Sequence, residues 1–184
     1  MTDRTTFVEI NDGDSLKEGY FNGGRTRMKV FTFSDATEET HTGDTNYTTI
    51  KTGTLTPDDT TNNIILGVYV SCDLKNSNAG VWTQARVKIG DWINDLKTSG
   101  EADLGVLGTS YDTVTDNYLG GLMDPNAGIT LFSAPGSVNM FESSYTVEFQ
   151  IQTFNSGETA YAENVEIKIL VLQGDWDTES PSFS

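Results

Sequence analysis

The side chains most often used in catalysis and metal binding are scarce in this sequence. The chain contains one histidine, His41, and one cysteine, Cys72. A hydrolytic triad needs a base beside its nucleophile, and His41 lies in a polar stretch with no G-x-S-x-G motif around it. Cys72 lies in the apolar run 64–74, where a free thiol packs as a small hydrophobic side chain. One histidine and one cysteine do not supply the usual ligands of zinc.

Acidic residues are abundant, with 27 Asp and Glu against 11 Lys and Arg and a formal net charge of −16. A glycosidase needs two carboxylates at a set separation, but a chain this acidic offers many pairs, so their number is no evidence for one. Calcium binds hard oxygen ligands, which gather at residues 11–14, 58–59 and 175–177. None of these segments has the spacing of an EF-hand loop. We expect no cofactor and keep calcium as an alternative.

Length and composition narrow the class of protein. A chain of 184 residues suits one domain with its own hydrophobic core. Phosphate contact requires a basic face, so a chain this acidic is not expected to bind nucleic acid. No apolar run approaches the roughly 18 residues of a membrane span, and the N-terminus lacks the basic and apolar segments of a secretory signal. We therefore expect no membrane insertion and no signal peptide.

Period-two alternation of apolar and polar residues is the strongest structural signal. Residues 145–152 and 165–172 alternate around a Gly-containing turn, which predicts two antiparallel neighbouring strands. Residues 64–74 and 81–89 form a second pair around a loop with Asn and Gly. Shorter β-prone runs lie at residues 7–10, 27–33, 47–55 and 129–132. Seven or eight strands without alternating helices predict an all-β fold, an antiparallel β-sandwich of jelly-roll type.

Two short helices are expected beside the sandwich. Ser15 and Glu18 have the spacing of a capping box, and Leu16 and Tyr20 fall on one helical face before a pair of glycines. Residues 90–96 predict a second helix, with an aspartate in the capping position.

The predicted organisation has three parts: an arm with its short helix at residues 1–24, the sandwich at 25–177, and a flexible tail at 178–184. Within the sandwich, residues 98–128 lose their periodicity and are rich in Gly, Asp and Thr. An excursion of this length either carries assembly contacts or crosses between strands, and both alternatives stay open.

The segment from Ile10 to Asn22 is expected to form a strand, an Asp-Gly turn and a short helix that ends in Phe-Asn. It resembles a segment at the start of tail, fibre and other virion proteins of tailed bacterial and archaeal viruses. The resemblance implies a non-enzymatic structural subunit located in the virion, as a capsid decoration, tail or fibre module. It also implies a homo-oligomer that contacts other virion proteins, with Leu16, Tyr20 and Phe21 as candidate assembly contacts.

Two other functions remain open. Jelly-roll modules of this kind also resemble receptor-binding and carbohydrate-binding domains, and Trp176, Tyr111 and Tyr118 are the candidates for stacking on a surface glycan. A glycoside-cleaving enzyme would need a carboxylate pair in a cleft with one shifted pKa. Because no catalytic constellation is visible, we expect a protein that is not an enzyme.

Overall fold

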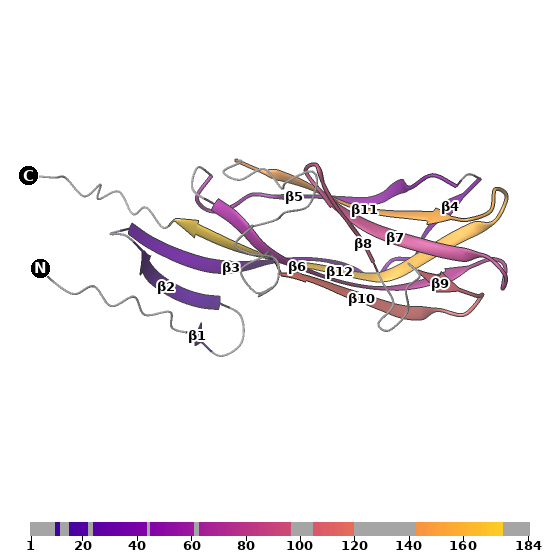
Figure 1. The fold of residues 1–184 in the computed structure, drawn as a ribbon, viewed down its shortest axis with the longest axis horizontal. Helices are drawn as coiled ribbons and strands as arrows, with labels where there is room; N and C mark the ends of the chain where they lie inside the picture. The colour runs from indigo at the N-terminus through magenta and orange to yellow at the C-terminus, as the bar shows by residue number, and fades with distance from the viewer. Residues whose placement is uncertain are drawn as a thin grey trace, which may run out of the picture.

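The computed structural model describes residues 10–11, 15–21, 24–43, 45–60, 63–96, 105–119 and 143–174, and every regular element within these ranges is a β-strand (Figure 1). The strands are β1 (Ile10–Asn11), β2 (Ser15–Phe21), β3 (Gly24–Asp35), β4 (Glu39–Thr42), β5 (Thr48–Leu55), β6 (Asn63–Asn76), β7 (Trp82–Ile89), β8 (Trp92–Asp95), β9 (Val106–Leu107), β10 (Asp112–Leu119), β11 (Tyr145–Thr153) and β12 (Thr159–Gly174).

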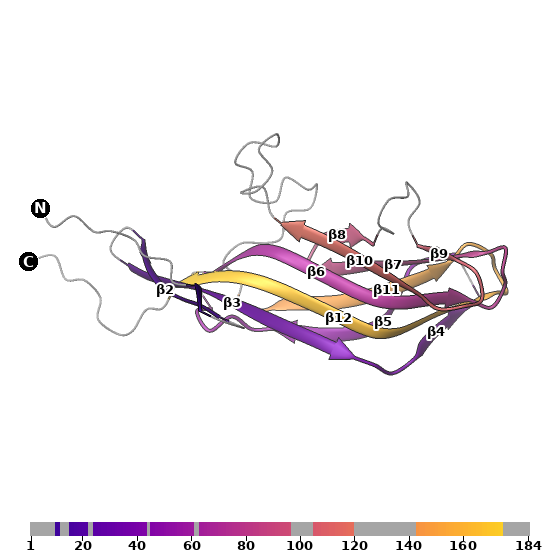
Figure 2. The same ribbon diagram turned by 90° about the horizontal axis from the view of Figure 1, so that it is seen from below.

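The strands form two antiparallel sheets that pack as a sandwich, which confirms the predicted fold class. The larger sheet has the order β1-β2-β3-β12-β6-β10, with β4 also paired to β12. The smaller sheet has the order β5-β11-β7-β8, with β9 also paired to β7. Figure 2 shows the long strands of both sheets running along one axis of an elongated body.

The core forms where the alternating strands of the two sheets face each other. Along β7, buried and partly exposed residues alternate without a break. From the larger sheet, Val70 and Ile169 point inward, and from the smaller sheet, Val87 and Ile151 do the same. Burial of this apolar surface is the main force that stabilises a sandwich. The alternation therefore fixes which side chains remain on the outer faces.

The two predicted strand pairs are wrong in their pairing, although their strands exist. Strands β11 and β12 lie in different sheets, and so do β6 and β7. Instead β12 pairs with β6, whereas β11 pairs with β7 and β5. A polar loop of five or six residues can cross the roughly 10 Å between packed sheets as well as the roughly 4.8 Å between neighbouring strands. Alternation indicates the buried face of a strand but not its neighbour.

Both predicted helices are wrong, because the structure has strands at these positions. Residues 15–21 form β2, which pairs with β3 across a bulge between Leu16 and Gly19. Glycine disfavours a helix interior, and a single helical turn is costly to nucleate, whereas pairing with an existing strand supplies hydrogen bonds at once. Residues 92–95 form β8, in which buried Trp92 alternates with exposed Ile93.

The segment 98–128 is less irregular than predicted where the structure describes it. Residues 112–119 form β10, which pairs along its whole length with β6. The strand is mostly polar in sequence, and among its described side chains Val114 belongs to the core. The run predicted at residues 129–132 lies outside the described residues.

Candidate functional site

The outer face of the smaller sheet carries an ordered row of side chains along β7. The row consists of Trp82, Gln84, Arg86 and Lys88, which alternate with buried residues of the core. Strand β11 places polar partners directly opposite three of them, as register pairs Gln152–Gln84, Gln150–Arg86 and Glu148–Lys88. Paired residues on one face of an antiparallel sheet lie within contact distance of each other. The face is therefore built from matched cross-strand pairs.

Hydrogen bonds fix the polar centre of this face. The Nε of Arg86 donates to Oε1 of Gln150 at 2.6 Å, and Nε2 of Gln150 donates to Oγ1 of Thr49 at 2.9 Å. The hydroxyl of Thr49 in turn donates to Oε1 of Glu148 at 2.9 Å. Gln150 is only 7% exposed although it points outward, because its neighbours cover it. Its amide thus holds the surrounding side chains in place.

An aromatic ring adds to this network from the chain segment before β5. The guanidinium of Arg86 lies 4.0 Å from the centre of the Tyr47 ring. The Tyr47 hydroxyl donates to Oε1 of Gln84 at 3.2 Å, and Nε2 of Gln152 donates to the same oxygen at 2.5 Å. Burial, followed by the charge of Asp95, raises the pKa of Tyr47 to about 12. The phenol therefore remains a neutral donor at physiological pH.

One end of the row is apolar, with a half-buried tryptophan beside two exposed side chains. Trp82 pairs with Leu107 of β9, and the backbone N–H of Phe154 donates to the carbonyl of Trp82 at 3.1 Å. Phe154 is 52% exposed and Leu107 46% exposed. We call Trp82, Phe154 and Leu107 the aromatic end. Large apolar side chains grouped at the surface indicate a contact site.

The opposite end of the row is cationic. Lys88 forms an ion pair with Glu148 at 3.3 Å and is partly exposed. Its register partner in β8 is Ile93, whose side chain is 43% exposed. We call Lys88 and Ile93 the basic end.

The predicted stacking residue Tyr111 lies with the larger sheet and already has a cation against its ring. The Nζ of Lys75 lies 4.0 Å from the centre of the Tyr111 ring and 4.7 Å from that of Tyr161. Glu38 accepts hydrogen bonds from the Tyr111 hydroxyl and, at 3.2 Å, from Lys75. These bonds lower the pKa of Glu38, whereas burial and the Glu38 hydrogen bond raise the pKa of Tyr111. Because Lys75 lies against the ring of Tyr111, less of that ring is accessible for stacking on a glycan.

The other predicted site residues are only partly described. Tyr118 lies in β10, and Leu16, Tyr20 and Phe21 lie in β2, but the structure describes only the backbone of these four. Trp176 lies outside the described residues. Their roles in stacking and assembly remain predictions.

The candidate reactive groups have structural partners or are buried. Nε2 of His41 lies 3.5 Å from the hydroxyl of Thr48. Cys72 is fully buried, and burial raises the pKa of its thiol. Oδ1 of Asp58 lies 2.9 Å from Nζ of Lys29, and Oδ2 of Asp58 accepts a hydrogen bond from Nε2 of Gln173 at 3.0 Å. Among the described residues, no three His, Cys, Asp or Glu side chains gather as a metal site.

No helix among the described residues is long and apolar enough to cross a membrane.

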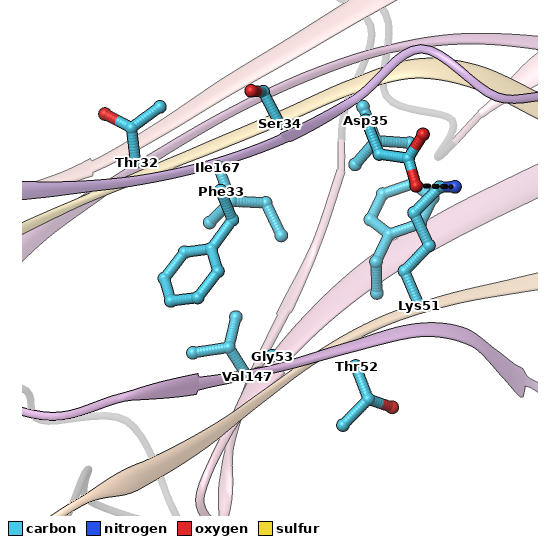
Figure 3. Close-up of a pocket in the computed structure, with 11 residues that line it drawn as sticks. Thr32, Phe33, Ser34, Asp35, Lys51, Thr52, Gly53, Val147 and Ile167 are labelled. Carbon is cyan, nitrogen blue, oxygen red and sulfur yellow. Dashed lines mark hydrogen bonds and ion pairs between the residues drawn. The ribbon is translucent and has the colours of Figure 1, made fainter.

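A cleft of about 400 Å³ opens between the sheets, along the edges of β3 and β5 (Figure 3). Core residues such as Phe149 and Ile167 form its floor. The ring of Phe33 reaches from β3 to Gly53 of β5, where a Cβ would lie 2.7 Å from two ring carbons. Gly53 is therefore needed for this close approach.

An ion pair joins the two edges beside the cleft. Nζ of Lys51 lies 2.9 Å from Asp35 and 3.4 Å from Glu39. The hydrogen bond from Lys51, followed by that from the backbone of Thr37, lowers the pKa of Asp35 from 3.8 to about 2.

This shift predicts a pH dependence for the stability difference between wild type and Asp35→Asn. A carboxyl with a lowered pKa stabilises the folded state above its unfolded pKa and loses this effect as pH falls through its folded pKa. The wild type should therefore exceed the variant in stability above about pH 4, and the difference should vanish towards pH 2. Urea unfolding from pH 2 to pH 6 measures it. A difference that stays constant down to pH 2 contradicts the prediction.

Among known proteins, this chain resembles solved structures in its fold, but its sequence matches no family model and no curated protein. A chain of the infectious bursal disease virus Gt strain matches 84% of this chain and 45% of its own length, at 9% identity and a TM-score of 0.48. A chain of T=1 particles derived from infectious bursal virus matches 93% and 41%, at 10% identity and a TM-score of 0.46.

A bacterial chain matches as well. Latent PorU from Porphyromonas gingivalis is matched over 80% of this chain and 13% of its own length, at 11% identity and a TM-score of 0.41. The chain thus spans less than half of each of these three matched chains, and the likeness concerns the fold alone.

Proposed function

We propose that this chain is a non-enzymatic structural subunit of a virus particle, a capsid decoration, tail or fibre module that acts through subunit–subunit contacts. The observation that carries the proposal is the aromatic end of the β7 row, where Trp82, Phe154 and Leu107 gather at the surface of a sandwich. Protein interfaces are enriched in Trp, Phe, Tyr and Arg, and clustered aromatic side chains commonly supply most of the binding energy.

Two further features support the proposal. Within the segment 10–22, which resembles the start of virion proteins, β1 pairs with β2 and β2 pairs with β3, so these strands extend the larger sheet. The polar side chains further along the row are held in place by hydrogen bonds between Arg86, Gln150 and Thr49, as in an interface whose polar groups are ordered beside an apolar part.

The experiment is to locate the chain in particles. Particles purified from cultures of the source organism are labelled with gold-conjugated antibody against the chain and viewed by electron microscopy, and their chain content is quantified by mass spectrometry. We expect gold at regular positions and a fixed ratio to the other particle proteins. Particles that are free of the chain would contradict the proposal.

A carbohydrate-binding module is the second candidate, because the planar polar groups of Gln84 and Gln152 lie on the same face as the aromatic end, with Arg86 further along β7. Such groups bind sugar hydroxyls, and aromatic rings stack on pyranose faces. A glycan array with and without a calcium chelator tests both the sugar and the ion. Binding that is lost in Trp82→Ser would support this candidate, and an array without signal would exclude it.

A further inference from the structure

We propose that the outer face of the smaller sheet binds the same face of a second copy of the chain about a two-fold axis. In this contact the aromatic end of one protomer lies over the basic end of its partner, so that Trp82 meets Lys88 and Ile93 at both ends. The inference rests on the proposed function, since it names the partner of the same surface.

Charge is the first argument for a second copy. The outer positions of β5, β11, β7 and β8 carry two cations, Arg86 and Lys88, and two acids, Glu148 and Asp95. This face is neutral overall, whereas the whole chain has a formal net charge of −16. Like charge over most of the surface opposes self-association. Two copies can therefore approach through this face with little repulsion.

The spacing along β7 is the second argument. In a contact about a two-fold axis, if one residue of the first protomer contacts a second residue of its partner, that second residue of the first protomer also contacts the first residue of the partner. Trp82 and Lys88 mark the two ends of the row, about 20 Å apart at roughly 3.3 Å per residue. An axis near Ala85, the midpoint, places the Trp82 of each protomer on the Lys88 of the other. Both Trp–Lys contacts are then formed by one symmetry operation.

The chemistry of the two ends is complementary. An ammonium over an indole ring gains cation–π attraction, for which Trp is the best aromatic partner. Ile93 lies beside Lys88 across β7 and β8, so the same indole also covers an exposed aliphatic side chain. Burial of the indole and of Ile93 stabilises the contact through the hydrophobic effect. Burial of the exposed side chains of Phe154 and Leu107 adds to this effect.

The centre of the face is already fixed before binding. Arg86 is stacked on Tyr47 and hydrogen-bonded to Gln150, so little side-chain freedom is lost when a partner covers it. Preorganised polar side chains at the centre and apolar contacts at both ends suit a face that docks as a rigid body.

Sedimentation equilibrium of the full chain over a wide concentration range tests the proposal. We expect a monomer–dimer equilibrium for the wild type. Trp82→Ser should weaken the dimer about thirtyfold or more, as loss of an interface Trp commonly does. Lys88→Gln should weaken it less, through the loss of the cation. Val30→Ser is the matched control, because Val30 is 41% exposed but lies on the larger sheet.

Several outcomes would overturn the inference. These are a wild type that stays monomeric at every concentration, Trp82 and Lys88 variants that dimerise as tightly as the wild type, or a Val30 variant that weakens the dimer equally. Thermal unfolding of each variant separates misfolding from loss of contact, and Lys88→Gln tests the face without removal of the indole. Particles that contain the chain, together with a failed dimer test, would leave the proposed function intact. A dimer without particle incorporation would refute that function alone.

Discussion

Replacement of Phe149 with alanine is expected to lower the free energy of unfolding by about 3–5 kcal/mol. Phe149 points inward from β11, is 1% exposed and packs within the core of the sandwich. Its removal deletes apolar contacts with both sheets and leaves a void that close-packed neighbours fill only in part. Because Phe149 also lines the cleft between β3 and β5, partial collapse of that cleft would place the loss at the lower end of this range.

The same chain offers a matched control in Phe154. This residue follows β11 directly and is 52% exposed, so Phe154→Ala should change the free energy of unfolding by no more than about 0.5 kcal/mol. Urea unfolding followed by circular dichroism measures both variants. Equal losses from the two phenylalanines would contradict the assignment of inward and outward faces on which the candidate interface depends.

Alternation along the strands could be predicted from the sequence because burial repeats every second residue in a pleated strand. It identified β11 and β12 and correctly indicated that Ile151 and Ile169 face the core. It did not indicate that the strands cross between sheets, since a short polar loop spans either separation. Strand β10 could not be predicted from the sequence. Its polar residues pair with β6 through backbone groups, and such pairing leaves no pattern of side-chain types.

The candidate interface was missed for a related reason. The alternating residues Gln84, Arg86 and Lys88 are visible in the sequence, as are Glu148, Gln150 and Gln152 in a later strand. Only the pairing of β7 with β11 shows that these two sets form one surface. The aromatic end depends in addition on β9, whose two residues pair with β7. The sequence also predicts that the ring of Tyr111 can stack on a glycan, but in the structure Lys75 lies against that ring.

A buried amide joins the two sheets at one end of the sandwich. Asn76 ends β6 in the larger sheet, and its Nδ2 donates to the hydroxyls of Thr83 at 3.0 Å and Thr153 at 3.1 Å, both in the smaller sheet. Its Oδ1 accepts a hydrogen bond from the backbone of Asn78 at 3.1 Å. Loss of this amide would remove a hydrogen-bond partner from several groups at once. Each buried polar group that is left without a partner costs about 1–3 kcal/mol.

Asn76→Ala should therefore lower the free energy of unfolding by about 2–4 kcal/mol, whereas Asn78→Ala, in an exposed loop, should cost far less. Asn76→Asp separates the hydrogen bonds from the packing. A buried aspartate has a raised pKa, so the deficit of this variant should be small near pH 4, where the protonated acid can still donate, and should grow as pH rises. Urea unfolding of the variant and the wild type at pH 4 and pH 8 measures this change. If the deficit of Asn76→Asp were the same at both pH values, the amide donors would not be what holds this end of the two sheets together.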